Sequence, residues 1–299
     1  MNTAIVTGAA GFAGCNLTET LIDQGYNVIA VLRPNSAHNS RMEPLKASGR
    51  LICVELDISE IGKLPELISG KDADTFFHLA WSGERDDFNA QYKNIADTVN
   101  SLEAAAAAGC GRFICTGSQA EYGITESIQT EDMCPSPFSA YGAAKTAAMY
   151  LSKRRAGQLS IEWIWGRIFS LYGRYEPSKT LVQYIINAVK NDEAIHVTSA
   201  EQNWDYLDAI DAANALIALG ERGKDGEIYN IANGSYRPLK EFIEEIVKKT
   251  AVQEGCSLHN STYPAVHYDK IAAETVSLQP SVEKIKHDTG WQPKRKFME

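Results

Sequence analysis

The chain contains 299 residues, of which 44% are hydrophobic and 22% are charged, so it can bury a large core and is not intrinsically disordered. Its formal net charge is -9. This acidic balance argues against nucleic acid or an anionic membrane as the main partner, because both select clustered basic surface. A small anionic molecule is still compatible with it, since a few arginines or a helix N-terminus can bind one.

The six cysteines are scattered, with no C-x-x-C pair and no histidine at metal-ligand spacing. We therefore expect no metal site and interpret the cysteines as reduced core thiols of a cytoplasmic protein. The first apolar run, residues 3–8, is short and leads directly into a glycine turn. It predicts neither a signal peptide nor a membrane span.

The first predicted element is a strand followed by a glycine-rich turn, in "TAIVTGAAGFAG". Gly8, Gly11 and Gly14 precede a segment whose apolar residues have helical spacing and which stops at Gly25. A tight turn leading into a helix N-terminus offers free N–H groups and the positive end of the helix dipole to a phosphate. Because the turn has this strand-to-helix context, we favour dinucleotide binding over a purely structural turn.

Four more short apolar runs, each typical of a buried parallel strand, follow at residues 27–33, 51–57, 74–80 and 112–118. A long alanine-rich helix is predicted over residues 88–109, between the last two runs. The alternation predicts an α/β fold, a Rossmann-type doubly wound parallel sheet with right-handed crossovers. Such sheets bind ligands at the carboxyl ends of their strands. The residues expected to line one crevice there are Gly8, Arg33, Asp57, Ala80 and Ser118.

Tyr141 and Lys145 lie four residues apart in "FSAYGAAKTA", so on a helix they share one face. An isolated Tyr-x-x-x-Lys is more often an ordinary helix surface than a catalytic pair. The motifs around this pair change its interpretation.

Five motifs in order, "TGAAGFAG", "HLAW", "TGSQAEYG", "YGAAK" and "GRIFSLYG", make the chain resemble the extended short-chain dehydrogenase/reductase superfamily. This is the NAD-dependent epimerase/dehydratase group of sugar-nucleotide enzymes, and the resemblance extends to "KIKHDTGWQPK". It implies a catalytic set of Ser118, Tyr141 and Lys145, with Asn94 shaping the active site. Cofactor contacts implied by the resemblance are Gly8, Gly11, Phe12, Gly14, Arg33, Asp57, Ile58, Leu79, Ala80, Tyr141 and Lys145.

The implied chemistry agrees with the residue types. A free phenol titrates near pH ~10, and the lysine cation together with the oxidised nicotinamide ring favours the phenolate. Tyr141 then exchanges the hydroxyl proton while hydride moves between the substrate carbon and the nicotinamide. Ser118 hydrogen-bonds the substrate oxygen, and Lys145 also holds the nicotinamide ribose.

The cofactor form depends on the end of the second strand, where NAD-dependent folds usually carry an acidic residue. Arg33 stands at this end instead and suits the 2′-phosphate of NADP, although arginine is also common there as a surface residue. We therefore expect NADP rather than NAD. Asp57 resembles the family aspartate that contacts the adenine amino group, or is a turn residue at the strand end.

The reaction type is indicated by departures from the family pattern. Family dehydratases carry an Asp-Glu pair directly after the catalytic Ser/Thr, whereas this chain has Gln119 and Ala120, neither of which transfers a proton. A 4,6-dehydratase is therefore not expected. Epimerases and reductases share the remaining set, and Arg33 favours a reductase because a reductase consumes NADPH in every cycle.

The substrate site is expected in the second half. Trp204 occupies the position of the arginine that meets the diphosphate in many relatives, and "WDYL" resembles reductases of the CDP-abequose synthase type. Trp204 either packs on a base or sugar ring or belongs to the core. Trp81 is expected to narrow the sugar pocket. Gln119 is a further substrate candidate. Arg167, Arg174 and Lys179 are either partners of a substrate phosphate or ordinary surface charges.

We predict a dinucleotide-binding domain over residues 1–165 and a smaller α/β substrate-binding part over 166–299, discontinuous and packed on the first. Helices are expected over residues 181–191, 209–223 and 239–250. The chain ends soon after "GWQPK", where relatives usually carry another helix, which leaves a truncated end open. A homodimer is expected by resemblance.

The function predicted from these patterns is NADPH-dependent reduction of a nucleotide-linked 4-keto-6-deoxyhexose. The alternatives are an NAD(P)-dependent sugar-nucleotide 4-epimerase, a reductase of a flavonoid-like or aliphatic ketone, and a non-catalytic NADP-sensing regulator.

Overall fold

The computed structural model describes residues 2–254, 265–269 and 275–299. At its centre is a seven-stranded sheet in the order β11-β6-β5-β4-β1-β2-β3, and every pair of neighbours in it is parallel. Its strands are β1 (Thr3–Thr7), β2 (Asn27–Leu32), β3 (Leu51–Glu55), β4 (Thr75–His78), β5 (Arg112–Ser118), β6 (Glu162–Ile168) and β11 (Ile228–Ile231). The five strands predicted in the first half are confirmed.

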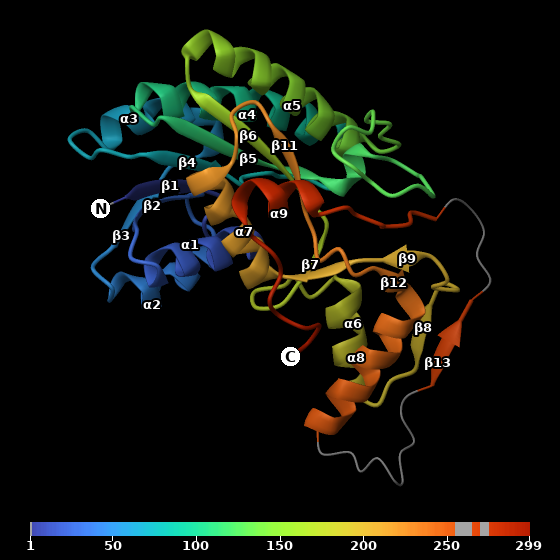
Figure 1. Cartoon of the computed structure of the whole chain (residues 1–299). Helices are drawn as coiled ribbons and strands as arrows, with labels where there is room; N and C mark the ends of the chain where they lie inside the picture. The colour runs from blue at the N-terminus through green and yellow to red at the C-terminus, as the bar shows by residue number, and fades with distance from the viewer. Residues whose placement is uncertain (1, 255–264, 270–274) are drawn as a thin grey trace.

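Helices cover both faces of the sheet (Figure 1). On one face lie α1 (Phe12–Asp23), α7 (Ala209–Arg222) and the short α9 (Glu283–Thr289), which share one hydrophobic cluster with the sheet. The other face carries α4 (Phe88–Ala107) and α5 (Ala140–Leu159), packed on a second cluster that includes the stacked rings of Trp163 and Trp165. The short helices α2 (Glu43–Lys46) and α3 (Leu64–Leu67) follow β2 and β3. The Rossmann-type doubly wound fold is confirmed.

Three short 3₁₀ helices follow strands at the carboxyl edge of the sheet: η1 (Ala37–Met42), η2 (Ile58–Lys63) and η3 (Gln119–Glu121). The residue before each helix, Ser36, Asp57 and Ser118 respectively, accepts a backbone N–H of the first turn with its side chain. Side-chain caps of this kind satisfy the donors that a helix start leaves unpaired. They hold the segments after β2, β3 and β5 in place at the edge where ligands bind.

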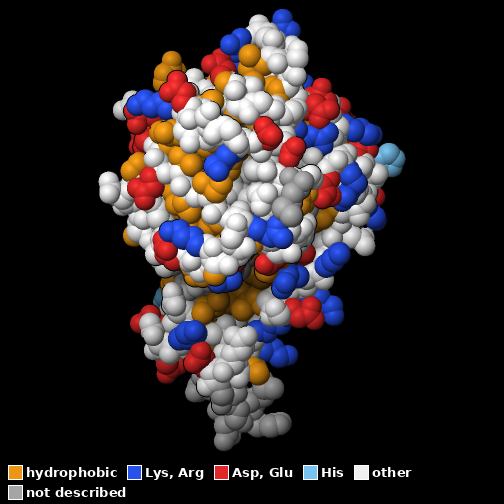
Figure 2. Space-filling model, turned by 90° about the vertical axis from the view of Figure 1, so that its left-hand side faces the viewer, with side chains coloured by type: hydrophobic (Ala, Val, Ile, Leu, Met, Phe, Trp, Pro, Cys, Tyr) orange, Lys and Arg blue, Asp and Glu red, His pale blue; other side chains and the backbone are white. Residues whose placement is uncertain are grey.

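A smaller lobe extends from the sheet and is built around α6 (Leu181–Lys190) and α8 (Leu239–Gln253). Its short strand pairs are β7 (Ser170–Tyr172) with β10 (Tyr206–Asp208), β9 (Asn203–Trp204) with β12 (Arg237–Pro238), and β8 (Ile195–Val197) with β13 (Val266–Tyr268). The view in Figure 2 shows this lobe projecting from the main body, with hydrophobic atoms visible where the two meet.

The predicted boundary near residue 165 lies inside β6, and α7 and β11 return from the second half to the main body. The lobe is therefore discontinuous in sequence. The three helices predicted in the second half correspond to α6, α7 and α8. Phe297, near the end of the chain, packs among Tyr172, Tyr206 and Phe242 and joins the last described segment to the lobe.

The expectation that all cysteines are core thiols is wrong for Cys134, which is exposed, and Cys53 is only partly buried. Cys15, Cys110 and Cys115 are buried, and Cys256 lies outside the described residues. Within the described segments, no helix is long and apolar enough to cross a membrane.

Candidate active site

The glycine turn between β1 and α1 is fixed by close backbone contacts. Gly8 has φ +68°, and a Cβ there would lie 2.8 Å from the Ala80 nitrogen. A Cβ on Gly14 would lie 2.1 Å from the Gly8 oxygen, so Gly14 lets the helix pack on the turn. Gly11 is the N-cap of α1, and no side chain caps the N–H groups of the first turn. Those N–H groups fit a dinucleotide pyrophosphate, which needs unpaired donors at a helix N-terminus.

A cleft of ≈ 310 Å³ opens at the carboxyl edge of the sheet beside this turn. It brings together most of the residues expected to bind the cofactor. The expected cofactor residues that line it are Gly8, Gly11, Arg33, Asp57, Ile58, Leu79 and Ala80. Trp81 and Asn94, predicted for the sugar pocket and the active site, line it as well, whereas Ser118, Tyr141 and Lys145 are not among the lining residues. Phe12 and Gly14 are in the first turn of α1 and are not among the lining residues. The cleft therefore joins the ends of β1, β2, β3 and β4, as the strand pattern predicted.

Arg33 stands exposed at the end of β2, on the rim of the cleft. Asn39 donates its amide N–H to the Arg33 backbone oxygen (3.0 Å), which folds the next segment back over the strand end. Ser36, His38 and Asn39 line the cleft as well. Sequence reasoning missed these three, and the polar cluster directly after a strand end was the available signal. The Arg41 guanidinium donates to the Ala10 oxygen at 3.0 Å and lies 5.0 Å from the Tyr175 ring centre.

Asp57 caps η2, with its Oδ1 accepting from the Ser59 backbone nitrogen (3.0 Å) and from the Ser59 hydroxyl (2.5 Å). These hydrogen bonds hold the pKa of Asp57 below its ordinary value. Asp57 is thus a turn residue at the strand end, which was one of the two roles predicted for it. It also lines the cleft, so this role does not exclude a contact with a ligand.

Asn94, on α4, is buried and holds the segment after β4. Its Oδ1 accepts from the Ser82 nitrogen (3.1 Å), and its amide donates to the Ser82 oxygen (2.8 Å). Two reciprocal bonds to one residue fix the backbone there. The neighbouring Trp81 is fixed in turn, since its indole N–H donates to Gln91 on the same helix (2.8 Å).

Tyr141 and Lys145 lie on the first turns of α5, whose N-cap is Ser139. The buried Lys145 donates to the Thr116 oxygen (2.7 Å), and burial lowers its pKa to about 8. Burial raises the pKa of Tyr141, whereas a hydrogen bond with Ser118 lowers it. The structure therefore brings Ser118, Tyr141 and Lys145 together, the last two from one helix and Ser118 from the end of β5.

Trp81 joins this cluster to the cleft. The Lys145 ammonium lies 3.6 Å from the centre of a Trp81 ring, a cation–π contact, and the Tyr141 ring meets Trp81 edge-on at 5.9 Å. Arg85, which sequence reasoning missed, lies 5.9 Å from the Tyr141 ring centre, and its charge lowers the pKa of Tyr141. Trp81 therefore contacts both side chains predicted to be catalytic, besides lining the cleft.

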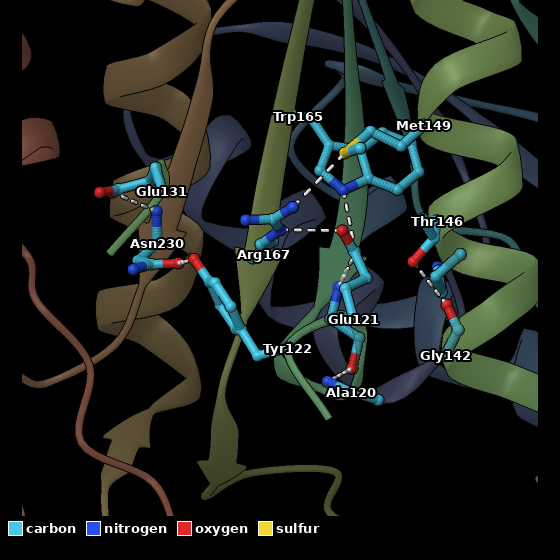
Figure 3. A network of polar contacts seen from close by, with 12 residues as sticks. Ala120, Glu121, Tyr122, Glu131, Gly142, Thr146, Met149, Trp165, Arg167 and Asn230 are labelled. Atoms are coloured by element: carbon cyan, nitrogen blue, oxygen red, sulfur yellow. Dashed lines mark hydrogen bonds and ion pairs between the residues drawn. The ribbon is translucent and has the colours of Figure 1, made fainter. Parts of the chain in front are cut away.

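The buried carboxylate of Glu121 holds the backbone of Ser118, and Figure 3 shows its contacts with Trp165 and Arg167. Glu121 Oε1 accepts from the Ser118 nitrogen (2.8 Å) and from the Trp165 indole (2.9 Å), and its Oε2 forms an ion pair with Arg167 at 2.8 Å. Glu121 and Arg167 have side-chain exposures of 0% and 1%. Arg167 is thus a structural partner of Glu121, and the expectation that it meets a substrate phosphate disagrees with this placement. The pair escaped sequence reasoning because 46 residues separate its members.

The same network continues toward β11. Tyr122, whose ring lies 4.5 Å from the Arg167 guanidinium, donates to Asn230 Oδ1 at 2.6 Å. The Asn230 backbone nitrogen donates to Glu131 at 2.9 Å (Figure 3). The support of Ser118 is therefore anchored on strands β6 and β11 and on the loop that follows η3.

The remaining substrate candidates are dispersed. Gln119 follows Ser118 in η3 and is partly buried. Arg174 forms an exposed ion pair with Glu19 (3.0 Å), and Lys179 is exposed. Trp204, in β9, packs against hydrophobic clusters of the lobe and of the junction. None of the four lines the cleft.

Comparison with known proteins agrees with this arrangement. Residues 4–232 match the model of the NAD dependent epimerase/dehydratase family. The chain is 27% identical over 257 residues to CDP-abequose synthase of Salmonella muenchen, covering 82% of this chain and 80% of that relative. It is 24% identical over 312 residues to UDP-glucose 4-epimerase of Corynebacterium glutamicum, covering 97% and 90% of the two chains.

Among solved structures, MoeE5 in complex with UDP-glucuronic acid and NAD superposes with a TM-score of 0.81 at 26% identity, over 99% of this chain and 95% of that one. The family match spans the glycine turn, the cleft and the Ser118, Tyr141 and Lys145 cluster. This chain belongs to the NAD dependent epimerase/dehydratase family.

Proposed function

We propose that this protein is an NADPH-dependent reductase of a nucleotide-linked 4-keto-6-deoxyhexose. The observation that carries the proposal is the contact of Lys145 and Tyr141 with Trp81, which joins the proposed proton-transfer cluster to the cleft at the carboxyl edge of the sheet. Because the two sites meet at one side chain, a substrate carbonyl beside Tyr141 would also be beside the reactive end of a cofactor in the cleft.

The residues of the cluster have distinct roles in this reaction. The nicotinamide cofactor supplies the hydride when it is bound. Ser118 donates a hydrogen bond to the substrate carbonyl oxygen, and Tyr141 delivers the proton that turns this oxygen into a hydroxyl. Burial favours the protonated phenol, as a proton donor requires, and the hydrogen bond with Ser118 opposes it. Lys145 holds the ribose next to the nicotinamide.

The form of the cofactor follows from Arg33. Its exposed guanidinium stands on the rim of the cleft together with Ser36, His38 and Asn39, which supply hydrogen-bonding groups around it. A 2′-phosphate is bound well by a guanidinium and neighbouring hydroxyl and amide donors, whereas NAD offers them only a neutral hydroxyl. We therefore propose NADP(H) as the physiological cofactor.

The substrate class is inferred from the relatives. CDP-abequose synthase and UDP-glucose 4-epimerase are named for nucleotide sugars, and MoeE5 was solved with one. We propose that the sugar lies beside Tyr141 and Trp81 and that Trp204 and Arg174 lie on the path of the nucleotide. A cytoplasmic location and a homodimeric assembly belong to the same proposal.

A sugar-nucleotide 4-epimerase is the second candidate. It is favoured by the match to an epimerase over 97% of this chain. The same cluster would serve it, because Tyr141 can remove as well as deliver a proton, with the hydride returned to the same sugar. Dehydration is disfavoured, because Gln119 and Ala120 transfer no proton and the nearest carboxylate, Glu121, is bound to Arg167. A non-catalytic NADP-sensing regulator would lack turnover altogether.

The test is to follow the absorbance of NADPH with purified protein and a pool of CDP-, dTDP-, UDP- and GDP-linked 4-keto-6-deoxyhexoses. Consumption of one NADPH per sugar, absent from Tyr141→Phe, is the expected result. No consumption, together with a C4 epimer found by NMR, would replace the reductase by the epimerase. Competition by CDP, UDP, dTDP and GDP then separates a nucleotide sugar from a flavonoid-like or aliphatic ketone.

A further inference from the structure

Asp97 is a residue in the wall of the cleft whose carboxylate takes no part in the proposed reaction steps. It lies on α4 one helical turn after Asn94, and its side chain lines the cleft with Asp57 and Ile58 of the segment after β3. The residue is 5% exposed. Helix α4 packs against η2, which Asp57 caps, so the two carboxylates approach the same part of the cleft from neighbouring elements.

One carboxylate oxygen of Asp97 is left without a partner in the part of the chain that the structure describes. Among the described residues, its Oδ2 atom is buried without any hydrogen-bond partner. Burial raises the pKa of Asp97, and the charges of Lys93 and Asp57 act on it in opposite directions. Leaving a buried acceptor unpaired costs free energy, which a ligand that donates a hydrogen bond would recover. Asp57 differs, since Ser59 already occupies its Oδ1.

The place of Asp97 in the cleft indicates which part of a dinucleotide it would face. The pyrophosphate belongs at the glycine turn, and the nicotinamide end belongs at Trp81, beside Tyr141 and Lys145. The adenosine half then extends over the ends of β2 and β3, where Arg33, Asp57 and Ile58 line the cleft. Adenine carries one exocyclic amino group with two N–H donors, and its ring nitrogens are acceptors. A carboxylate can pair only with the amino group.

We propose that Asp97 binds the exocyclic amino group of the cofactor's adenine, so that the cleft recognises this base through Asp97 in addition to any contact with Asp57. The inference rests on the proposed use of a nicotinamide adenine dinucleotide. It adds a cofactor-binding residue to those that the family motifs indicate. Lys93, one turn earlier at the rim, acts on Asp97 through its charge and supplies no acceptor for the base.

The test measures two dissociation constants by quenching of tryptophan fluorescence. One is for NADPH, and the other is for the analogue of NADPH that carries hypoxanthine, in which a carbonyl oxygen replaces the amino group of adenine. Wild-type protein is expected to bind NADPH at least about tenfold more tightly, because the analogue turns an acceptor toward a carboxylate. Asp97→Asn keeps the shape and can donate to the carbonyl, so the preference should fall to about threefold or less. Asp97→Ala is the second variant and should reduce the preference by losing the acceptor.

Lys93→Gln is the matched control, because it alters the same helix and rim without removing the acceptor, and it should keep the wild-type preference within about twofold. Asp57→Asn measures the share of the other carboxylate. If both Asp97 variants keep the wild-type preference for NADPH over the analogue and have melting temperatures like that of the wild type, the proposed role of Asp97 is overturned. The proposed function would not be affected by that result. If neither NADPH nor NADH binds to wild-type protein, the proposed function itself fails and the inference fails with it.

Discussion

The two ends of the cleft differ in how their polar groups are used. Trp81 joins one end, called the catalytic end after the proposed reaction, to a cluster in which Lys145 is bonded to Thr116, Ser118 to Glu121 and Ala120, and Glu121 to Arg167. At the adenosine end, Arg33 is exposed and Asp97 has a buried oxygen without a partner among the described residues. The catalytic end is already assembled by the protein, whereas the adenosine end provides groups that a ligand would complete.

This difference predicts that substitutions at the catalytic end change turnover and stability, whereas those at the adenosine end change cofactor affinity and selectivity. The largest effect is expected at Tyr141, the only group of the cluster assigned to proton transfer. Tyr141→Phe should lower kcat by about 10²–10⁴-fold, because the phenylalanine ring delivers no proton. NADPH affinity should stay nearly unchanged, as measured by fluorescence titration. Activity above a few per cent of wild type would contradict the assignment.

The support under Ser118 should matter for stability. Arg167→Met leaves Glu121 buried without its counter-ion, which should cost about 3–5 kcal/mol in the free energy of unfolding. The double variant Glu121→Gln/Arg167→Met should recover much of this loss, because no uncompensated charge stays buried. Urea unfolding of both variants measures the difference. A loss below about 1 kcal/mol in Arg167→Met would show that the pair is not the anchor described here.

Lys145 should make stability depend on pH. Its folded pKa of about 8 lies below the ordinary value of 10.5, so the unfolded chain binds more protons between these two pH values. The cost of burying the charge is present below pH ~8 and declines as the pH rises. The stability of wild-type protein relative to Lys145→Met should therefore increase by about 2 kcal/mol between pH ~7 and pH ~9.5, measured by urea unfolding without cofactor. A constant difference would contradict a depressed pKa.

The smallest of these effects is expected at the adenosine end. Arg33→Ala should raise the dissociation constant for NADPH by about 10–100-fold, since one charge-assisted contact to the 2′-phosphate is lost. The dissociation constant for NADH serves as the internal control and should change by less than about threefold. Equal weakening of both cofactors would assign Arg33 to a general role in the cleft rather than to the 2′-phosphate.

Much of the main body was predictable because its signals are local. Short apolar runs predicted β1 to β5, and the glycine spacing predicted the turn before α1, both of which the structure contains. The pairing of Glu121 with Arg167 was not predictable in this way. It depends on the register between β5 and β6, which places Gly117 opposite Arg167. Arg167, predicted to contact the substrate, is therefore buried in the core.

The position of Asp97 in the cleft could not be predicted from the sequence either. It lies in a long helix with polar residues on several faces, and only the packing of α4 against η2 decides that this carboxylate faces the cleft. The contact between Trp81 and Lys145 likewise depends on how α5 lies against the segment after β4. Residue type and spacing indicated the chemistry, and the contacts between elements determined which residues surround it.

Central to the proposed function is a hydride that passes from NADPH to C4 of a nucleotide-linked sugar while Tyr141, in the cluster with Ser118 and Lys145, delivers the proton to the sugar oxygen. The most direct measurement is mass spectrometry of the product formed with NADPH deuterated at nicotinamide C4, using both stereospecifically labelled forms. We expect one of the two forms to place a single deuterium on the new carbinol carbon, with loss of an equal amount of NADPH. A product without deuterium from either form, formed without loss of NADPH, would contradict the claim.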